Sequence, residues 1–266
     1  MLELQHVQKT YNPGAVTELR LFDDFNLTVA KGEFVSIVGS NGSGKTSLLN
    51  LICGSIQPDG GDVRIAGQSI LRQPEHRRYQ RIGRVYQNPA LGACPSLTVL
   101  ENMALADNKG RRFGLGRGVS RERIPFYRQQ LAGLGLGLED KLGVKMGSLS
   151  GGQRQAVALV MATMTPLDFL ILDEHTAALD PHTADRIMEL TDRVVREKQL
   201  TAMMVTHNLR YAVEYGSRLL MLDHGRVAFD CAGAEKAALA VEDVLGRFNA
   251  LRFDCGGEPA PARRAG

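Results

Sequence analysis

The stretch Gly39–Thr46, "GSNGSGKT", decides the fold. It fits the pattern G-x-x-x-x-G-K-[ST], in which glycines let the backbone turn tightly so that its N–H groups surround phosphates. The run "EFVSIVG" at 33–39 predicts a buried strand before it, and "GKTSLLNLICG" predicts a helix after it that ends at Gly54. The alternative is a glycine-rich turn with an incidental lysine, which the flanking strand and helix disfavour. A strand, a glycine loop and a helix in this order predict a phosphate-binding loop in an α/β fold.

Two further apolar runs predict strands that are buried on both faces of a parallel sheet. "FLILD" at 169–173 is apolar for four residues before its aspartate, and "AMMVTH" at 202–207 repeats that form. A helix over about 183–198 between them would complete a right-handed βαβ unit. Because Ser150 is a good N-cap, another helix is expected over 151–165, ended by Pro166.

Alternation and turn residues predict the remaining core strands. We expect strands at 2–7, 24–30 and 62–67, and a hairpin over 218–230 that turns at His224-Gly225. The strand "GRVYQN" is expected to end at Gln87. These elements surround the phosphate-binding loop on both sides of the sequence.

The region from about 89 to 145 has a different sequence pattern, with short helical segments and many glycines. This pattern predicts an inserted helical subdomain. The region contains a basic stretch, formed by Lys109, Arg111, Arg112, Arg117, Arg121, Arg123 and Arg128. They fit either a solvated loop or a surface that docks to a partner or to lipid headgroups. The last dozen residues, "CGGEPAPARRAG" at 255–266, are expected to form a flexible tail.

Composition excludes several classes of protein. The chain has 266 residues, of which 32 are basic and 29 acidic, and a net charge of +3 is too balanced to indicate direct nucleic-acid binding. Cys53, Cys94, Cys231 and Cys255 have neither zinc-ligand spacing nor the density of a disulfide framework. The N-terminal residues lack a signal-peptide pattern, and no apolar run approaches the roughly 18 residues of a membrane span. We therefore expect reduced thiols, and any membrane role through a partner.

A magnesium-nucleotide site is predicted from residues that follow the buried strands. Lys45 would contact the β- and γ-phosphates, Thr46 would ligate Mg²⁺, and Asp173 lies where the family of such sites needs a carboxylate. In an extended segment the Glu174 side chain points away from that of Asp173, so it can act on a water as a general base. A carboxylate that caps a strand end is a plausible alternative for Glu174 alone, but it is weak once Lys45, Thr46 and Asp173 are taken together with it.

Two more polar residues end predicted strands. His207 is either a satisfied core histidine or, as we favour, a residue at the carboxyl edge of the sheet, where ligands bind in parallel sheets. Gln87 is as consistent with a ligand of the metal or the water as with a turn cap.

A second anion-binding pattern lies at 148–156, "SLSGGQRQA", with a hydroxyl, two glycines and the start of a helix. One chain has one Lys45-type loop, so a second such place within the same chain would be redundant. A helix N-terminus in a separate helical insert would also be a poor partner for phosphates that the core already holds.

Together these motifs resemble the ATP-binding subunits of ABC transporters, over about residues 2–230. The resemblance assigns a Walker A loop, a Q-loop, an "LSGGQ" signature, a Walker B strand "FLILDE", a D-loop "ALD" and a switch histidine, in that order along the chain. The ATP-binding positions that it implies are Tyr11, Gly39, Ser40, Asn41, Gly42, Ser43, Gly44, Lys45, Thr46 and Ser47. Those that it implies for catalysis, Mg²⁺ and the partner's ATP are Gln87, Ser150, Gly151, Gly152, Gln153, Asp173, Glu174, Asp180 and His207.

The same resemblance implies the architecture. It is a RecA-like P-loop NTPase core over 2–88 and 155–230, with an antiparallel β subdomain and an α-helical insert at 89–154. A C-terminal helical segment at 231–254 completes one ABC ATPase domain, 2–254. Tyr11 is similar to the adenine-stacking aromatic of the family, and a plain exposed tyrosine is the alternative.

The implied function is ATP hydrolysis that powers a membrane transporter. Its implied partners are a second copy of the chain, transmembrane permease subunits and an extracytoplasmic substrate-binding protein, with the chain at the cytoplasmic face of the inner membrane. An ATPase that extracts lipoproteins or regulates a membrane complex is one alternative. A second is a soluble ABC ATPase on nucleic acid or ribosomes, which the absence of a fused second unit disfavours.

One residue departs from the family pattern. His175 replaces the proline of D-E-P-T in "DEHTAALDP", and it either titrates near neutral pH beside Glu174 or is tolerated in a turn, which we favour. "DEHTAALDP" also resembles a subgroup of bacterial importer ATPases, some assigned to aromatic amino acids.

Overall fold

The computed structural model describes residues 1–111 and 118–254, with the backbone alone for 251–254. A six-stranded sheet forms its centre, in the order β10-β9-β3-β8-β7-β6. Its strands are β3 (Phe34–Gly39), β6 (Ile82–Val85), β7 (Phe169–Asp173), β8 (Ala202–Val205), β9 (Arg218–Asp223) and β10 (Arg226–Ala232). All neighbours are parallel except β9 and β10, which form the predicted hairpin with positive φ at His224 and Gly225.

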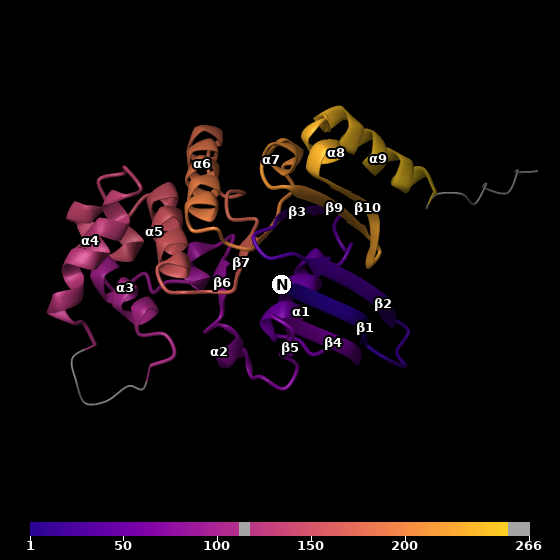
Figure 1. Ribbon diagram of the computed structural model, residues 1–266, viewed down its shortest axis with the longest axis horizontal. Helices are drawn as coiled ribbons and strands as arrows, with labels where there is room; N and C mark the ends of the chain where they lie inside the picture. The colour runs from indigo at the N-terminus through magenta and orange to yellow at the C-terminus, as the bar shows by residue number, and fades with distance from the viewer. Residues whose placement is uncertain (112–117, 255–266) are drawn as a thin grey trace, which may run out of the picture.

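A second, antiparallel sheet lies beside it, in the order β2-β1-β4-β5 (Figure 1). Its strands are β1 (Leu2–Tyr11), β2 (Leu19–Val29), β4 (Gly60–Ile65) and β5 (Gln68–Ser69). β1 pairs with both β2 and β4, so the N-terminal strand holds this sheet together.

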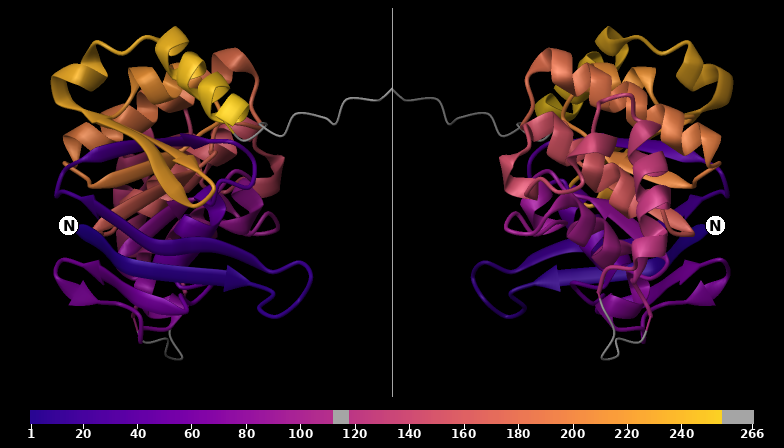
Figure 2. Two further views of the ribbon diagram at one scale, coloured as in Figure 1. Left: turned by 90° about the vertical axis from the view of Figure 1, so that its right-hand side faces the viewer. Right: turned by 90° about the vertical axis from the view of Figure 1, so that its left-hand side faces the viewer.

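The helices of the described residues lie around the two sheets. They are α1 (Lys45–Cys53), α2 (Glu75–Arg78), α3 (Val99–Asp107), α4 (Ile124–Ala132), α5 (Gly151–Thr163), α6 (Pro181–Glu197), α7 (Leu209–Glu214), α8 (Gly233–Ala237) and α9 (Val241–Asp254). α3, α4 and α5 gather on one side of the molecule, and α8 and α9 lie at the end opposite β4 and β5 (Figure 1 and Figure 2). None of these helices combines the length and apolarity that a membrane span requires.

The parallel strands are buried on both faces because their side chains alternate between two cores. In β7, Phe169 and Ile171 pack with α1 and the antiparallel sheet, whereas Leu170 and Leu172 pack with α5 and α6. α1 is thus enclosed between the two sheets. An unbroken apolar run is what such a strand requires, as the sequence predicted.

Several predicted elements are confirmed and others are wrong at their ends. β7, α6 and β8 form the predicted βαβ unit, and α5 begins at Gly151 as expected. β2 begins five residues earlier than predicted, at Leu19, and β6 ends at Val85, so Gln87 lies beyond its strand. The predicted tail, with Arg112 and Arg117 of the basic stretch, lies outside the described residues. The boundaries of the helical insert stay a prediction.

Part of the basic stretch binds within the chain. Lys109 donates to the carbonyl oxygen of Ile82 at 3.1 Å, and Arg123 forms two 2.7 Å contacts with Asp107. The Arg123 guanidinium also lies 4.0 Å from the centre of the Phe126 ring. Lys109 therefore joins the helical part to β6, and Arg123 stabilises the helical part itself, which argues against the whole stretch being a docking surface.

The buried Arg78 anchors the C-terminal end of α1. Its guanidinium donates to the carbonyl oxygens of Leu51 and Ile52 at 2.8 and 3.3 Å, and to those of Leu71 and Gln73. Burial lowers its pKa. Because a helix C-terminus carries unpaired carbonyls and partial negative charge, this cation supplies what the end of α1 lacks.

Replacing Arg78 by Met should lower the free energy of unfolding by about 2–4 kcal/mol, since several buried carbonyls lose their donors. Urea denaturation measures the loss. R77M on the exposed face of the same helix is the matched control and should change stability little. Equal stability of R78M and R77M would contradict the anchoring role.

Candidate functional site

The loop between β3 and α1 presents free backbone donors. Gly42 and Gly44 adopt φ of 81° and 105°, a left-handed conformation that favours glycine. Gly44 is the N-cap of α1, and no side chain caps that helix. The N–H groups at this N-terminus are therefore available to an anion, as the pattern "GSNGSGKT" predicts.

Lys45 brings a buried ammonium to the same loop. Its Nζ donates to the carbonyl oxygens of Gly39 and Ser40 at 2.8 and 2.9 Å. Burial lowers the pKa of Lys45, and the nearby negative charge of Glu174 partly offsets this. A cation and free N–H donors in one loop are the donor set that fits a polyphosphate.

The carboxylates of Asp173 and Glu174 point to different partners. Asp173 Oδ2 accepts from Nη2 of Arg84 at 2.6 Å, a contact that sequence reasoning missed. Glu174 Oε1 lies 2.7 Å from Nε2 of His207, which brings these two predicted residues together. The expectation that Glu174 is extended is wrong, because its φ is +46°, although its N–H still donates to the carbonyl oxygen of Val205 on β8.

The remaining predicted residues lie around this edge of the sheet. Thr46 and Gln87 are exposed, and the Tyr11 hydroxyl donates to Ser47 Oγ at 2.9 Å. In the described part of the chain no three His, Cys, Asp or Glu residues form a metal cluster. A threonine hydroxyl, a carboxylate and an amide oxygen nevertheless fit Mg²⁺, which takes few protein ligands and keeps water or phosphate oxygens.

Ser150 and Gln153 close the N-terminus of α5 with a capping box. Gln153 N donates to Ser150 Oγ at 3.2 Å, and Ser150 N donates to Gln153 Oε1 at 3.3 Å. The glycines between them differ in their surroundings. A Cβ at Gly152 would collide with the side chain of Thr183, whereas one at Gly151 would meet only Leu179 Cδ2, at 3.2 Å.

The signature and the phosphate-binding loop of one chain line separate cavities. Ser150, Gly152 and Gln153 border a cavity of about 320 Å³ next to the start of α6. Gly39, Ser40, Asn41 and His207 border another of about 330 Å³ beside α9. The two cavities share no residue. Asp180, the predicted D-loop aspartate, caps α6 by accepting from Thr183 N at 3.1 Å.

Comparison with known proteins identifies the family. Residues 22–177 match the profile described as "ABC transporter". The chain belongs to the ABC transporter family. It is 43% identical to a tyrosine transport ATP-binding protein of Clostridioides difficile, over 93% of this chain and 98% of that protein. It is 34% identical to a lipoprotein-releasing system ATP-binding protein of Caulobacter vibrioides, over 84% and 93%.

Solved ABC cassettes share the fold. A dimeric cassette in a post-hydrolysis state, bound to ADP and Pi, is 32% identical and covers 87% of this chain and 98% of its own, with a TM-score of 0.73. A second dimeric structure of a bacterial ABC transporter cassette gives a TM-score of 0.72 at the same identity and coverage. The predicted P-loop NTPase fold of the ABC type is confirmed, and the chain is an ATPase subunit of a transporter.

His175 is a buried, neutral residue of this ABC ATPase. It is 2% exposed, and its Nε2 lies 3.1 Å from Thr191 Oγ1 on α6. Because Thr191 donates to the carbonyl oxygen of Ile187, the ring nitrogen acts as the donor to Thr191. Burial lowers the pKa of His175 to about 4, so the alternative of titration near neutral pH is wrong.

The buried His175 should make the fold sensitive to acid. The unfolded chain takes up a proton near pH 6.5 whereas the folded chain does so only near pH 4, so stability falls as pH drops through this window. Between pH 7 and pH 5 this loss is about 2 kcal/mol. Urea denaturation at the two pH values should show a smaller loss in H175Q. H76Q, at an exposed position, is the control, and an equal loss in wild type and H175Q would refute the explanation.

Proposed function

We propose that this ATPase subunit binds MgATP between two copies of the chain and powers a bacterial importer of a small solute such as an aromatic amino acid. The meeting of Lys45, Asp173, Glu174 and His207 at the carboxyl edge of one parallel sheet carries the proposal. Ligands bind at this edge in open α/β sheets.

Different groups of residues bind the phosphates, the adenine and the metal of MgATP. Residues 39–47 surround the phosphates through N–H groups and Lys45, and Tyr11 stacks on the adenine from the end of β1. Thr46, Gln87 and Asp173 hold Mg²⁺. When bound, Mg²⁺ supplies positive charge that offsets the negative charge of the phosphates.

Glu174 and His207 act on the attacking water. We assign Glu174 as general base, because its carboxylate reaches past the end of β7 and its Oε1 contacts His207 Nε2. His207 orients that carboxylate and contacts the γ-phosphate. The two carboxylates have different partners, because Asp173 Oδ2 pairs with Arg84 whereas Glu174 Oε1 contacts His207.

A second copy completes each site through its signature. Ser150, Gly151, Gly152 and Gln153 of one chain meet the γ-phosphate held by the other, and Asp180 lies at the same interface. Support comes from the separate cavities within one chain and from the dimeric cassettes of related sequence.

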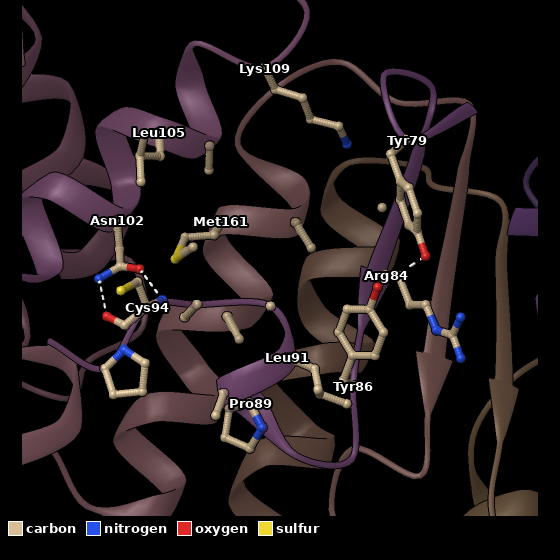
Figure 3. A pocket seen from close by; sticks show the side chains of 18 residues that line it. Tyr79, Arg84, Tyr86, Pro89, Leu91, Cys94, Asn102, Leu105, Lys109 and Met161 are labelled. Atoms are coloured by element: carbon tan, nitrogen blue, oxygen red, sulfur yellow. Dashed lines mark hydrogen bonds between the residues drawn. The ribbon is translucent and has the colours of Figure 1, made fainter. Parts of the chain in front are cut away.

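The groove between the core and the helical part is the proposed docking place of the permease. This groove of about 700 Å³ begins at Tyr86, next to Gln87, and runs along α3 and α5 (Figure 3). Leu91 and Leu105 on its wall are 69% and 50% exposed, which a partner would cover. Docking here holds the chain at the cytoplasmic face of the cell membrane.

The substrate is proposed from the relative named for tyrosine transport and from "DEHTAALDP". Lipoprotein release is the second candidate, because several relatives of 34–36% identity carry that name. The two candidates differ in partner, since an importer of this kind needs an extracytoplasmic substrate-binding protein.

Replacing Glu174 by Gln should preserve ATP binding and lower hydrolysis at least about a hundredfold, since the amide cannot take the proton. Phosphate release measures turnover, and light scattering should detect a dimer that accumulates with ATP. K45A is the control and should lose ATP binding in calorimetry. Near-normal hydrolysis by E174Q would contradict the base assignment.

Replacing Gly151 by Leu should leave ATP binding to the monomer intact and prevent the ATP-dependent dimer. Within its own chain an added Cβ meets only the end of the flexible Leu179 side chain, at 3.2 Å, so the main obstruction acts on the partner. Light scattering of G151L in the E174Q background tests this. G152A is the contrasting variant, expected to lose stability through the contact with Thr183, and a dimer of G151L would refute the interfacial signature.

Co-purification of the full chain with its membrane partners tests the transport function. Recovery of a permease and of a binding protein that binds tyrosine or another aromatic amino acid in calorimetry supports the importer. In proteoliposomes that ligand should stimulate ATP hydrolysis. Stimulation by a lipoprotein in its place would favour the second candidate.

A further inference from the structure

Arg84 is a buried cation beside the proposed metal site. It lies on β6, next to β7, and its side chain is 7% exposed. Its Nη2 contacts Asp173 Oδ2 at 2.6 Å and its Nη1 contacts Asn50 Oδ1 at 3.1 Å. Among the described residues, Asp173 is the carboxylate with which Arg84 pairs.

The two partners of Arg84 belong to the elements that carry the proposed metal ligands. Asp173 is itself one of them, and Asn50 lies one helical turn after Thr46 on α1. The guanidinium therefore bridges the end of β7 and the first turns of α1. It engages Oδ2 of Asp173 and leaves the other oxygen of that carboxylate for a metal.

The Arg84 guanidinium also contacts Tyr86, in the loop that leads to Gln87. It lies 4.7 Å from the centre of the Tyr86 ring, and the Tyr86 hydroxyl lies 3.0 Å from that of Tyr79 (Figure 3). The backbone oxygen of Tyr86 accepts from Nε2 of Gln155, a buried residue of α5 just after the signature. Arg84 is thus joined to the metal site, the Q-loop and the signature helix.

We propose that Arg84 is a positioning residue that fixes the Asp173 carboxylate and weakens the hold of the site on Mg²⁺. The inference rests on the proposed function of the site. A carboxylate that is oriented by a buried arginine needs no reordering when the metal arrives. The positive charge of Arg84 opposes the divalent cation at the same time, which favours the release of MgADP after hydrolysis.

The test is the ratio of ADP dissociation constants without and with Mg²⁺, measured by calorimetry on the full chain. In R84M the ratio should rise about tenfold, the order expected for removing a unit charge several ångströms from a divalent cation in a water-accessible site. Steady-state turnover should fall in the same variant. R84K retains the charge and should keep the wild-type ratio.

Arg81 offers a matched control, because it pairs with Asp168 between the opposite ends of the same two strands. R81M removes that cross-strand ion pair and should leave the ratio unchanged. R84Q loses the charge but can still hydrogen-bond to Asp173, so its ratio should rise at least as much as that of R84M, and it keeps the test valid if R84M does not fold.

The outcomes separate the inference from the proposed function. A wild-type ratio near one would overturn the metal site itself. A clear Mg²⁺ effect in wild type, with the same or a smaller ratio in R84M or R84Q, would overturn the role of Arg84 alone. A rise in R81M as large as in R84M would show that loss of any strand-joining ion pair suffices, which also overturns it.

Discussion

The parallel pairing of β3, β7 and β8 is the constraint on which the rest of the structure depends. Parallel strands end at one edge of the sheet, so Gly39, Asp173 and the segment before His207 are brought together from distant parts of the chain. Each strand must be apolar on both faces, because α1 and the antiparallel sheet cover one side and α5 and α6 cover the other. The polar residues of the site are confined to the strand ends for this reason.

The core strands, α1, α5, α6 and the β9–β10 hairpin were predictable because periodicity and local glycines determine them. The positive φ of Glu174 was not, since glutamate is not among the residue types that commonly adopt it. Arg84 gave no signal in sequence because its meaning depends on Asp173, 89 residues away. His175 was correctly expected to be an ordinary residue, but its burial against α6 is a tertiary property that "DEHTAALDP" does not encode.

The two glycines of the signature have different structural roles, although they are adjacent in the sequence. Gly152 is small because α6 approaches the start of α5, and Thr183 occupies the space of its side chain. A Cβ at Gly151 would meet only the end of the Leu179 side chain, at 3.2 Å, which a small shift of that side chain would relieve. The two adjacent glycines of the signature are therefore needed for different reasons. Folding of the single chain requires Gly152 to be small, whereas it does not explain the glycine at 151. Arg78 and Arg84 differ in a similar way. Arg78 donates to carbonyl oxygens at the end of a helix, whereas Arg84 donates to a carboxylate.

The turn of the β9–β10 hairpin contacts both the phosphate-binding loop and the antiparallel sheet, although it lies at the tip of a hairpin. The N–H of Gly225 donates to the carbonyl oxygen of Ser43 at 3.0 Å, and a side chain at Gly225 would collide with Leu21 of β2. Hairpin tips are usual places to insert a tag or an affinity label. In this protein an insertion at this tip would disrupt its contacts with the phosphate-binding loop and the antiparallel sheet. A label for imaging or capture should therefore be placed elsewhere on the surface.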